Sequence, residues 1–214
     1  VFEEAASKMK AKSFQKVGLP VRKAIEDMVK TEIGRADRPF RILCFGGSQG
    51  ARGINIPLSD AVKKNEDQWL NNIELVHQTG RLDIEMVQSK YKEAPESVEV
   101  FEYLNDMDQR YMWADLVIAR SGAGTVAELA ACGMPSILVP LASAADNHQQ
   151  KNAEAMVASG AAVMILQKDF TAKTLVSEIQ RIKNIPGLLQ AMSEKAKDFH
   201  TSKAAEQIAE ILIS

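Results

Sequence analysis

Six apolar runs rich in β-branched residues alternate with stretches of helical spacing, and this alternation limits the fold more than any other feature of the sequence. Near-continuous apolar runs such as 115–119 are typical of strands that are buried on both faces of a sheet. Strands that alternate with helices indicate a parallel sheet. We therefore predict an α/β fold with a doubly wound, six-stranded parallel sheet. The expected strands lie at 40–45, 72–77, 97–101, 115–119, 136–140 and 161–166, and the expected helices between them at about 50–64, 81–92, 106–113, 125–132 and 148–159.

The segments on either side of this alternation are predicted to be helical. Residues 171–213 contain no strand pattern and predict two or three helices, interrupted by the Asn-Ile-Pro-Gly of 184–187. Ahead of the first strand we expect a turn and then a helix with Pro20 near its start, where a missing N–H costs least. The last helix carries an apolar stripe, which is the pattern of a helix that docks on another protein surface rather than on lipid. The stripe consists of Ala204, Ile208, Ile211 and Leu212.

Charge and cysteine usage exclude several classes of protein. The 214 residues include 26 basic and 28 acidic side chains, mixed along the chain, so the net charge of −2 offers no basic stripe for nucleic acid. The apolar runs are shorter than the about 18 to 20 residues of a membrane-spanning helix. Cys44 and Cys132 lack metal-site or disulfide spacing, which indicates reduced, buried thiols and a cytoplasmic protein. The chain starts at Val1 without a signal-peptide pattern, and we expect a piece of a longer protein.

The glycine-rich stretch FGGSQGARGIN, at 45–55, connects the first expected strand to the first expected helix. Ligands of doubly wound sheets bind beyond the carboxyl ends of the strands. Gly46, Gly47 and Gly50 allow close backbone approach, Ser48 offers a hydroxyl, and the following helix offers unpaired N–H groups. The loop is therefore a predicted phosphate site; the alternative is a tight turn that holds nothing. The G-x-G-x-x-G and Walker A patterns are both incomplete, which weakens a dinucleotide oxidoreductase or nucleoside triphosphatase interpretation.

Two further loops carry polar groups beyond expected strands. In RSGAGTVAE, at 120–128, the carboxylate of Glu128 near a helix start can accept both hydroxyls of a ribose. The alternative is that Thr125 and Glu128 form a capping box. SAADNHQQKNA, at 143–153, offers amide and imidazole groups for sugar hydroxyls, and its alternative is an Asn-rich loop that caps a helix. Together with the glycine loop, these segments favour one site for a nucleotide diphosphate.

Taken jointly, the motifs resemble the C-terminal half of the MurG family, the bacterial N-acetylglucosaminyltransferases of peptidoglycan synthesis. The resemblance extends from about Val17 to the last helix and rests on VGLPVR, FGGSQGARGIN, HQTG, ADLVIARSGAGTVAELAACGMPSILVP and ADNHQQKNA. It implies the two-domain glycosyltransferase B fold, of which this chain would be the C-terminal Rossmann-like domain that binds UDP-N-acetylglucosamine. It also implies an N-terminal domain that binds the lipid-linked acceptor, and transfer of the sugar to lipid I with inversion, giving lipid II.

The resemblance also implies roles for individual residues. It assigns the diphosphate to the glycine loop, the ribose to Glu128, and the uracil edge to the backbone of Leu104. Arg22 matches an arginine at the interdomain junction, although Leu19 stands where the family more often has Asn. In the third loop, one alignment pairs His148 with Gln149 on the sugar and the other pairs Gln149 with Gln150. The predicted donor site comprises Arg22, Gly47, Ser48, Gln49, Leu104, Arg120, Ala123, Gly124, Thr125, Glu128, His148, Gln149 and Gln150.

Other expectations follow from what a half-enzyme lacks. We expect three parts: a junction segment at 1–38, the donor domain at 39–200, and a returning helix at 201–214. The general base is expected in the absent N-terminal domain, together with any membrane association at the cytoplasmic face, and the chain alone is expected to be inactive. Its last helix is expected either to fray beyond about residue 200 or to bury its apolar stripe in a homo-oligomer contact. We expect no cofactor and no metal, because NDMD at 105–108 opens a helix, where such residues are ordinary caps. The alternatives are a stand-alone donor subunit of a split glycosyltransferase and a non-catalytic nucleotide-sugar-binding module.

Overall fold

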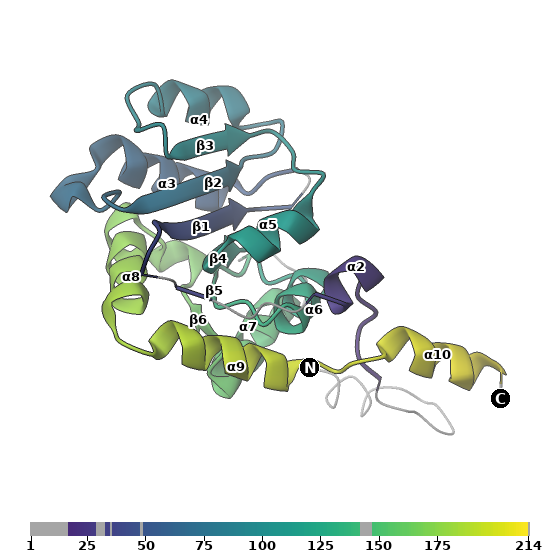
Figure 1. Ribbon diagram of the computed structural model, residues 1–214. Coiled ribbons are helices and arrows are strands. Elements are labelled where there is room, and N and C mark those ends of the chain that lie inside the picture. Colours follow the sequence, from purple (N-terminus) through teal and green to yellow (C-terminus); the bar gives the residue numbers. More distant parts are fainter. Residues whose placement is uncertain (1–16, 29–32, 35, 48, 142–146, 214) are drawn as a thin grey trace.

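A single parallel sheet organises the chain, as the alternation of strands and helices predicts. The computed structural model describes residues 17–28, 33–34, 36–47, 49–141 and 147–213. The sheet has six strands in the order β3-β2-β1-β4-β5-β6, all paired in parallel (Figure 1). This confirms the predicted fold class. The strands are β1 Phe40–Phe45, β2 Ile73–Gln78, β3 Val98–Phe101, β4 Leu116–Ala119, β5 Ser136–Leu138 and β6 Ala162–Met164.

Helices cover both faces of the sheet because successive strand residues point to opposite faces and both sets are apolar. Ile42 packs into the core under α3, α4 and α8, whereas its neighbour Leu43 packs into the core under α2, α5, α6 and α7. Both residues are fully buried, and α9 contributes side chains to both cores. The helices are α2 Lys23–Glu26, α3 Arg52–Lys64, α4 Ile84–Lys90, α5 Met107–Trp113, α6 Ala123–Ala131, α7 His148–Ser159, α8 Ala172–Asn184, α9 Leu188–Phe199 and α10 Ala204–Ile213, with short 3₁₀ turns at Glu66–Gln68 and Gln167–Asp169.

The helical C-terminal segment has the predicted interruption. Helix α8 ends at Asn184, and Gly187, with a φ of 75°, precedes α9. Helix α10 extends away from the sheet (Figure 1). In its stripe Ala204 is buried, Ile208 is half-buried, and Leu212 is 81% exposed. Among the described helices, none is long and apolar enough to cross a membrane.

The helix expected around Pro20 differs from the prediction. Helix α2 begins only at Lys23, after Arg22, whose extended backbone has a ψ of 135°. Pro20 therefore lies ahead of the helix rather than in its first turn. The segment is nevertheless anchored, because Ile25 is fully buried in the core beside α6.

Candidate functional site

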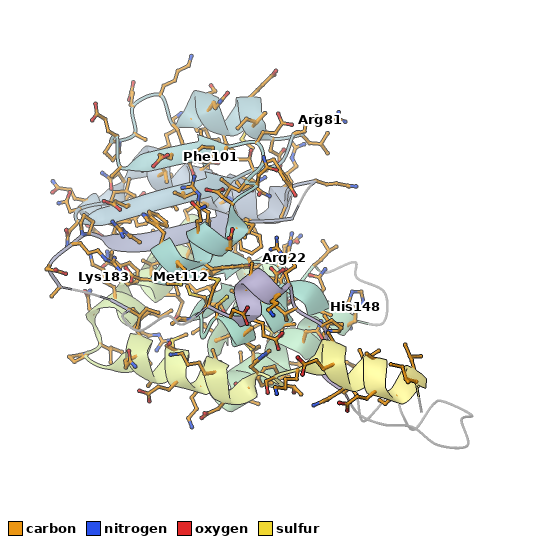
Figure 2. All side chains as sticks on the ribbon, turned by 45° about the vertical axis from the view of Figure 1, so that its right-hand side comes forward. Arg22, Arg81, Phe101, Met112, His148 and Lys183 are labelled. Atoms are coloured by element: carbon orange, nitrogen blue, oxygen red, sulfur yellow. The ribbon has the colours of Figure 1, made fainter. Side chains whose placement is uncertain are left out.

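A cavity of about 510 Å³ opens at the carboxyl edge of the sheet, where the loops after β1, β4 and β5 converge. The strand order reverses between β1 and β4, which is where ligands bind in open α/β sheets. In Figure 2, Arg22, Arg81 and His148 lie on the side to which the strands point, and Lys183 lies on the opposite side. The cavity is lined by Phe45, Gly46, Gly47, Gly50, Ala51, Arg52, Gly53, Arg120, Gly122, Thr125, Leu141, Gln149 and Gln167.

The glycine loop forms one wall of this cavity and packs backbone to backbone on the HQTG turn, residues 77–80. Gly47 and Gly50 have φ values of 86° and 82°, which favour glycine. The Gly50 N–H donates to the Gly47 carbonyl at 3.0 Å. A Cβ on Gly50 would lie 2.0 Å from the Thr79 carbonyl oxygen, so only glycine allows this approach. Of the predicted loop residues, Gly47 lines the cavity, Gln49 is exposed, and Ser48 lies outside the described residues.

Three helices that begin around the cavity present uncapped N-termini. The N-cap positions of α3, α6 and α7 are Ala51, Gly122 and Asn147, and none of these accepts a side-chain capping bond within the described chain. Their first turns carry neutral or basic side chains. Among the described residues the starts of α4, α5 and α9 also lack a side-chain cap, so α3, α6 and α7 are distinguished by beginning at the cavity, whereas α8 has a complete capping box of Thr171 and Thr174. Unpaired N–H groups and positive helix ends make this edge suited to an anion.

The second loop, RSGAGTVAE at 120–128, differs from the prediction in where its helix begins. Helix α6 begins at Ala123 after Gly122, so Thr125 is its third residue and Glu128 lies in the second turn. The spacing of a capping box is present, but its residues sit inside the helix, and that alternative is wrong. The expectation that Glu128 lies at the helix start is wrong for the same reason. Thr125 lines the cavity, and Ala123 and Gly124 are exposed in the first turn.

Glu128 instead joins two groups that are distant in sequence. Its Oε1 accepts from Arg22 Nε at 3.2 Å and Nη2 at 3.1 Å, which brings together two of the predicted site residues. Its Oε2 accepts from the hydroxyl of Tyr111 at 3.0 Å. Burial, and then the nearby carboxylate, raise the pKa of Tyr111 well above its ordinary value. Tyr111 therefore remains a neutral donor that orients Glu128. The sequence pattern of its helix did not predict this role.

Arg120 places a positive charge in the cavity wall. Its Nη1 donates to the carbonyl oxygens of Val139 and Pro140 at 3.0 and 3.1 Å, and its Nη2 to Oε1 of Gln167 at 2.7 Å. These acceptors are neutral, and none of the described carboxylates lies within ion-pair distance of the guanidinium. Burial lowers the pKa of Arg120, but an arginine still stays charged at neutral pH. Gln167, which holds this charge in place, was absent from the predicted site.

The backbone at Leu104 is tied to the HQTG turn. Leu104 is buried, and its N–H donates to Oε1 of Gln78 at 3.0 Å. Within the described residues the Leu104 carbonyl has no hydrogen-bond partner. Leu104 itself does not line the cavity, whereas the glycine loop beside it does. The Leu104 backbone group that has no partner among the described residues is therefore an acceptor.

The start of α7 is held on the second loop. The hydroxyl of Ser121 donates to the Gln149 carbonyl at 2.8 Å, and Nδ2 of Asn152 donates to the Ser121 carbonyl at 3.0 Å. Gln149, which both alignments place on the sugar, lines the cavity, and its Oε1 accepts from the N–H of Leu141. His148 is exposed, and Gln150 donates to Glu154; neither lines the cavity.

Polar residues away from the cavity have structural partners. His77 is fully buried between the hydroxyl of Tyr91 at 2.9 Å and Oδ1 of Asn55 at 3.1 Å, so both of its ring nitrogens have partners. Burial lowers its pKa to about 3. In NDMD, Asp106 stands at the N-cap of α5, but its carboxylate pairs with Arg110 at 3.0 Å. The described residues include no group of three or more His, Cys, Asp or Glu side chains that could hold a metal ion.

Comparison with known proteins identifies the family. The model of the glycosyltransferase family 28 C-terminal domain matches residues 41–208. The chain belongs to this family. This family 28 domain is 44% identical over its whole length to the UDP-N-acetylglucosamine–N-acetylmuramyl-(pentapeptide) pyrophosphoryl-undecaprenol N-acetylglucosamine transferase of Bdellovibrio bacteriovorus, and 37% identical over 99% of its length to that of Myxococcus xanthus.

A solved structure agrees with these relatives. The crystal structure of Acinetobacter baumannii MurG superimposes with a TM-score of 0.74 and 34% identity, covering 83% of this chain and 52% of that one. The predicted resemblance to the MurG family and the predicted glycosyltransferase B domain are therefore confirmed. The family 28 domain spans 58% and 55% of the two bacterial relatives' lengths, somewhat more than half.

Proposed function

We propose that this chain is the donor half of the inverting glycosyltransferase that converts lipid I to lipid II. The observation that carries the proposal is the cavity at the strand-order reversal, where three uncapped helix starts and Arg120 surround a glycine loop. These are groups that bind a diphosphate. The relatives are named as transferases of N-acetylglucosamine, which favours this function over a split donor subunit or a non-catalytic module.

The geometry supports a role in the departure of UDP. When the glycosidic bond of the donor breaks, roughly one additional negative charge develops on the β-phosphate. N–H donors at the starts of α3 and α6 and the guanidinium of Arg120 are already fixed in place, so they stabilise that charge without reorganisation. We propose that UDP-N-acetylglucosamine binds here without added metal or cofactor. The base that activates the acceptor hydroxyl belongs, in this proposal, to an N-terminal domain.

The uridine end of the donor would meet Leu104 and Glu128. The N–H of Leu104 already donates to Gln78, so the group that Leu104 offers is its carbonyl oxygen. This acceptor suits the N3–H of uracil and repels the N3 lone pair of cytosine. The Glu128 carboxylate, oriented by Tyr111, can accept both ribose hydroxyls when Arg22 yields one oxygen. Gln149, with His148 or Gln150, is proposed to bond the sugar. Lipid I binding and association with the cytoplasmic face of the membrane are proposed for the remaining half of the protein.

Calorimetric titration of the chain with UDP-N-acetylglucosamine, UDP, CDP and NAD tests this function. We expect UDP-N-acetylglucosamine and UDP to bind, CDP to bind at least tenfold more weakly, and NAD not to bind. Titrations in EDTA and in magnesium should give the same affinity, and the chain alone should form no lipid II from lipid I. Equal affinity for UDP and CDP, or binding only with magnesium, would contradict the proposal.

A further inference from the structure

Gln78 lies where the sheet brings two parts of the donor site together. It is the last residue of β2, and β2 runs between β3 and β1. In the register of the sheet, Gln78 stands beside Phe45 on one side and Phe101 on the other, each the last residue of its strand. The loop after Phe45 is the glycine loop, and the loop after Phe101 leads to Leu104. A side chain at the end of β2 therefore reaches both.

The Gln78 side chain uses both ends of its amide. Nε2 donates to the carbonyl of Gly47 at 3.0 Å, and Oε1 accepts from the N–H of Leu104 at 3.0 Å. Gln78 is only 3% exposed, so water cannot readily replace these hydrogen bonds when they are lost. The partners fix which end is which, because a carbonyl needs a donor and an N–H needs an acceptor. A carboxamide of this length satisfies both partners, whereas a carboxylate or a methyl group fails one or both.

The bond to Gly47 constrains the shape of the glycine loop. The Gly47 carbonyl accepts from Gly50 as well as from Gln78, so both of its lone pairs are occupied. This holds the carbonyl oxygen toward Gln78 and away from the place where a phosphate would need N–H donors. The bond to Leu104 directs that residue's N–H inward, which leaves its carbonyl for a ligand.

We propose that Gln78 is a positioning residue that couples the diphosphate loop to the uracil-reading segment, an inference that rests on the proposed function of the site. Neither Gly47 nor Leu104 is near Gln78 in sequence, with separations of 31 and 26 residues. The residue touches no ligand in this proposal; it acts through the two backbone groups that it holds. Its loss should therefore change ligand affinity more than it changes stability.

The test uses Gln78→Leu, which removes both bonds, and Gln78→Glu at pH 8.5, which keeps an acceptor for Leu104 but sets an oxygen against the Gly47 carbonyl. Ser193→Ala is the matched control, because Ser193 is also 3% exposed and donates one buried bond, to the Gly133 carbonyl. We expect Gln78→Leu to weaken UDP binding at least tenfold while its urea midpoint stays close to that of the control. Gln78→Glu should weaken UDP binding similarly but leave uridine binding within about twofold of wild type.

Hydrogen exchange on the ligand-free chain gives a readout that does not require UDP to bind. The amides of Leu104 and Gly50 should both exchange faster in Gln78→Leu, and in Gln78→Glu only that of Gly50 should do so. Unchanged exchange at both amides in Gln78→Leu would overturn the coupling, whether or not the wild type binds UDP. UDP affinities within about twofold of the Ser193→Ala control would show that Gln78 is only structural. Absence of UDP binding by the wild type would instead refute the proposed function, with the exchange result still deciding the role of Gln78.

Discussion

Three alanine substitutions separate the two reasons for which the donor site needs glycine. Gly47→Ala introduces a side chain at a φ of 86° but meets no atom within 4 Å. Gly50→Ala has nearly the same φ, 82°, and also places its Cβ 2.0 Å from the Thr79 carbonyl oxygen. Gly124→Ala, in the first turn of α6, has neither problem. Gly47→Ala therefore measures backbone strain alone, Gly50→Ala measures strain together with a steric clash, and Gly124→Ala is the control that has neither.

The expected magnitudes follow from these contacts. Left-handed backbone costs an alanine about 1 to 2 kcal/mol, which is the whole expected loss for Gly47→Ala. The Gly50 clash forces the backbone of the glycine loop or of the HQTG turn to shift, which adds about 1 to 3 kcal/mol. Gly50→Ala should thus lose about 2 to 5 kcal/mol, a large part of the about 5 to 15 kcal/mol that stabilises a typical domain. Gly124→Ala should gain about 0.5 to 1 kcal/mol, because alanine favours a helix.

Urea unfolding followed by tryptophan fluorescence measures all three free energies. Trp69 is 2% exposed, and its indole donates to the carbonyl of Ala61 in α3, the helix that follows the glycine loop. Its emission should therefore report loss of this packing. If Gly50→Ala costs no more than Gly47→Ala, the contact with Thr79 does not dictate glycine. If Gly124→Ala is destabilising, helix propensity does not control that position.

Three further predictions concern the carboxylate of Glu128, a buried histidine and the last helix. Glu128→Ala should weaken UDP binding tenfold or more by removing charge-assisted hydrogen bonds of about 1.5 to 3 kcal/mol each, whereas Glu178→Ala, which breaks an arginine–glutamate pair within α8 and away from the cavity, should leave calorimetric affinity unchanged. Because burial lowers the pKa of His77 from 6.5 to about 3, its neutral form stabilises the fold above pH 6.5. As the pH falls from 6.5 toward 3, wild type should lose up to about 1.4 kcal/mol per unit relative to His77→Gln in urea titrations, and the same pH dependence in both proteins would contradict this. The amides of α10 should exchange faster than those of α9 in a monomer, or be protected in a homo-oligomer; strong protection in a proven monomer would contradict this.

The sequence predicted the architecture because strands and helices are determined largely by local patterns of apolar residues. Each expected strand lies within one or two residues of an observed one, since a doubly buried strand needs an unbroken apolar run. Local spacing failed at Thr125 and Glu128, where a capping signature occurs inside a helix that starts two residues earlier, after Gly122. Small residues such as Gly122 and Ala123 let the helix begin before the signature, so spacing alone did not identify the start.

The supporting groups of the site were not predictable in the same way. Tyr111 orients a carboxylate 17 residues away, Gln78 holds two loops, and Gln167 bonds Arg120 across 47 residues. No periodicity encodes such pairs, because each depends on which loops the strand order brings together. The resemblance supplied motifs such as HQTG, but the bond that gives Gln78 its role is a property of the folded sheet.

The chain ahead of β1 and the chain after α9 meet on the same side of the molecule, and this contact connects to the carboxylate of Glu128. Gly18 packs so closely on Thr201 that a Cβ there would lie 2.8 Å from the threonine side chain, and Oε1 of Glu26 accepts from the N–H of Lys203 at 2.8 Å. Between Gly18 and Glu26 in the same segment, Arg22 reaches Glu128. A displacement of this segment would therefore both separate it from the start of α10 and remove a cation from Glu128. Whether Arg22 is paired with the Glu128 carboxylate therefore depends on the position of the segment that precedes the first strand.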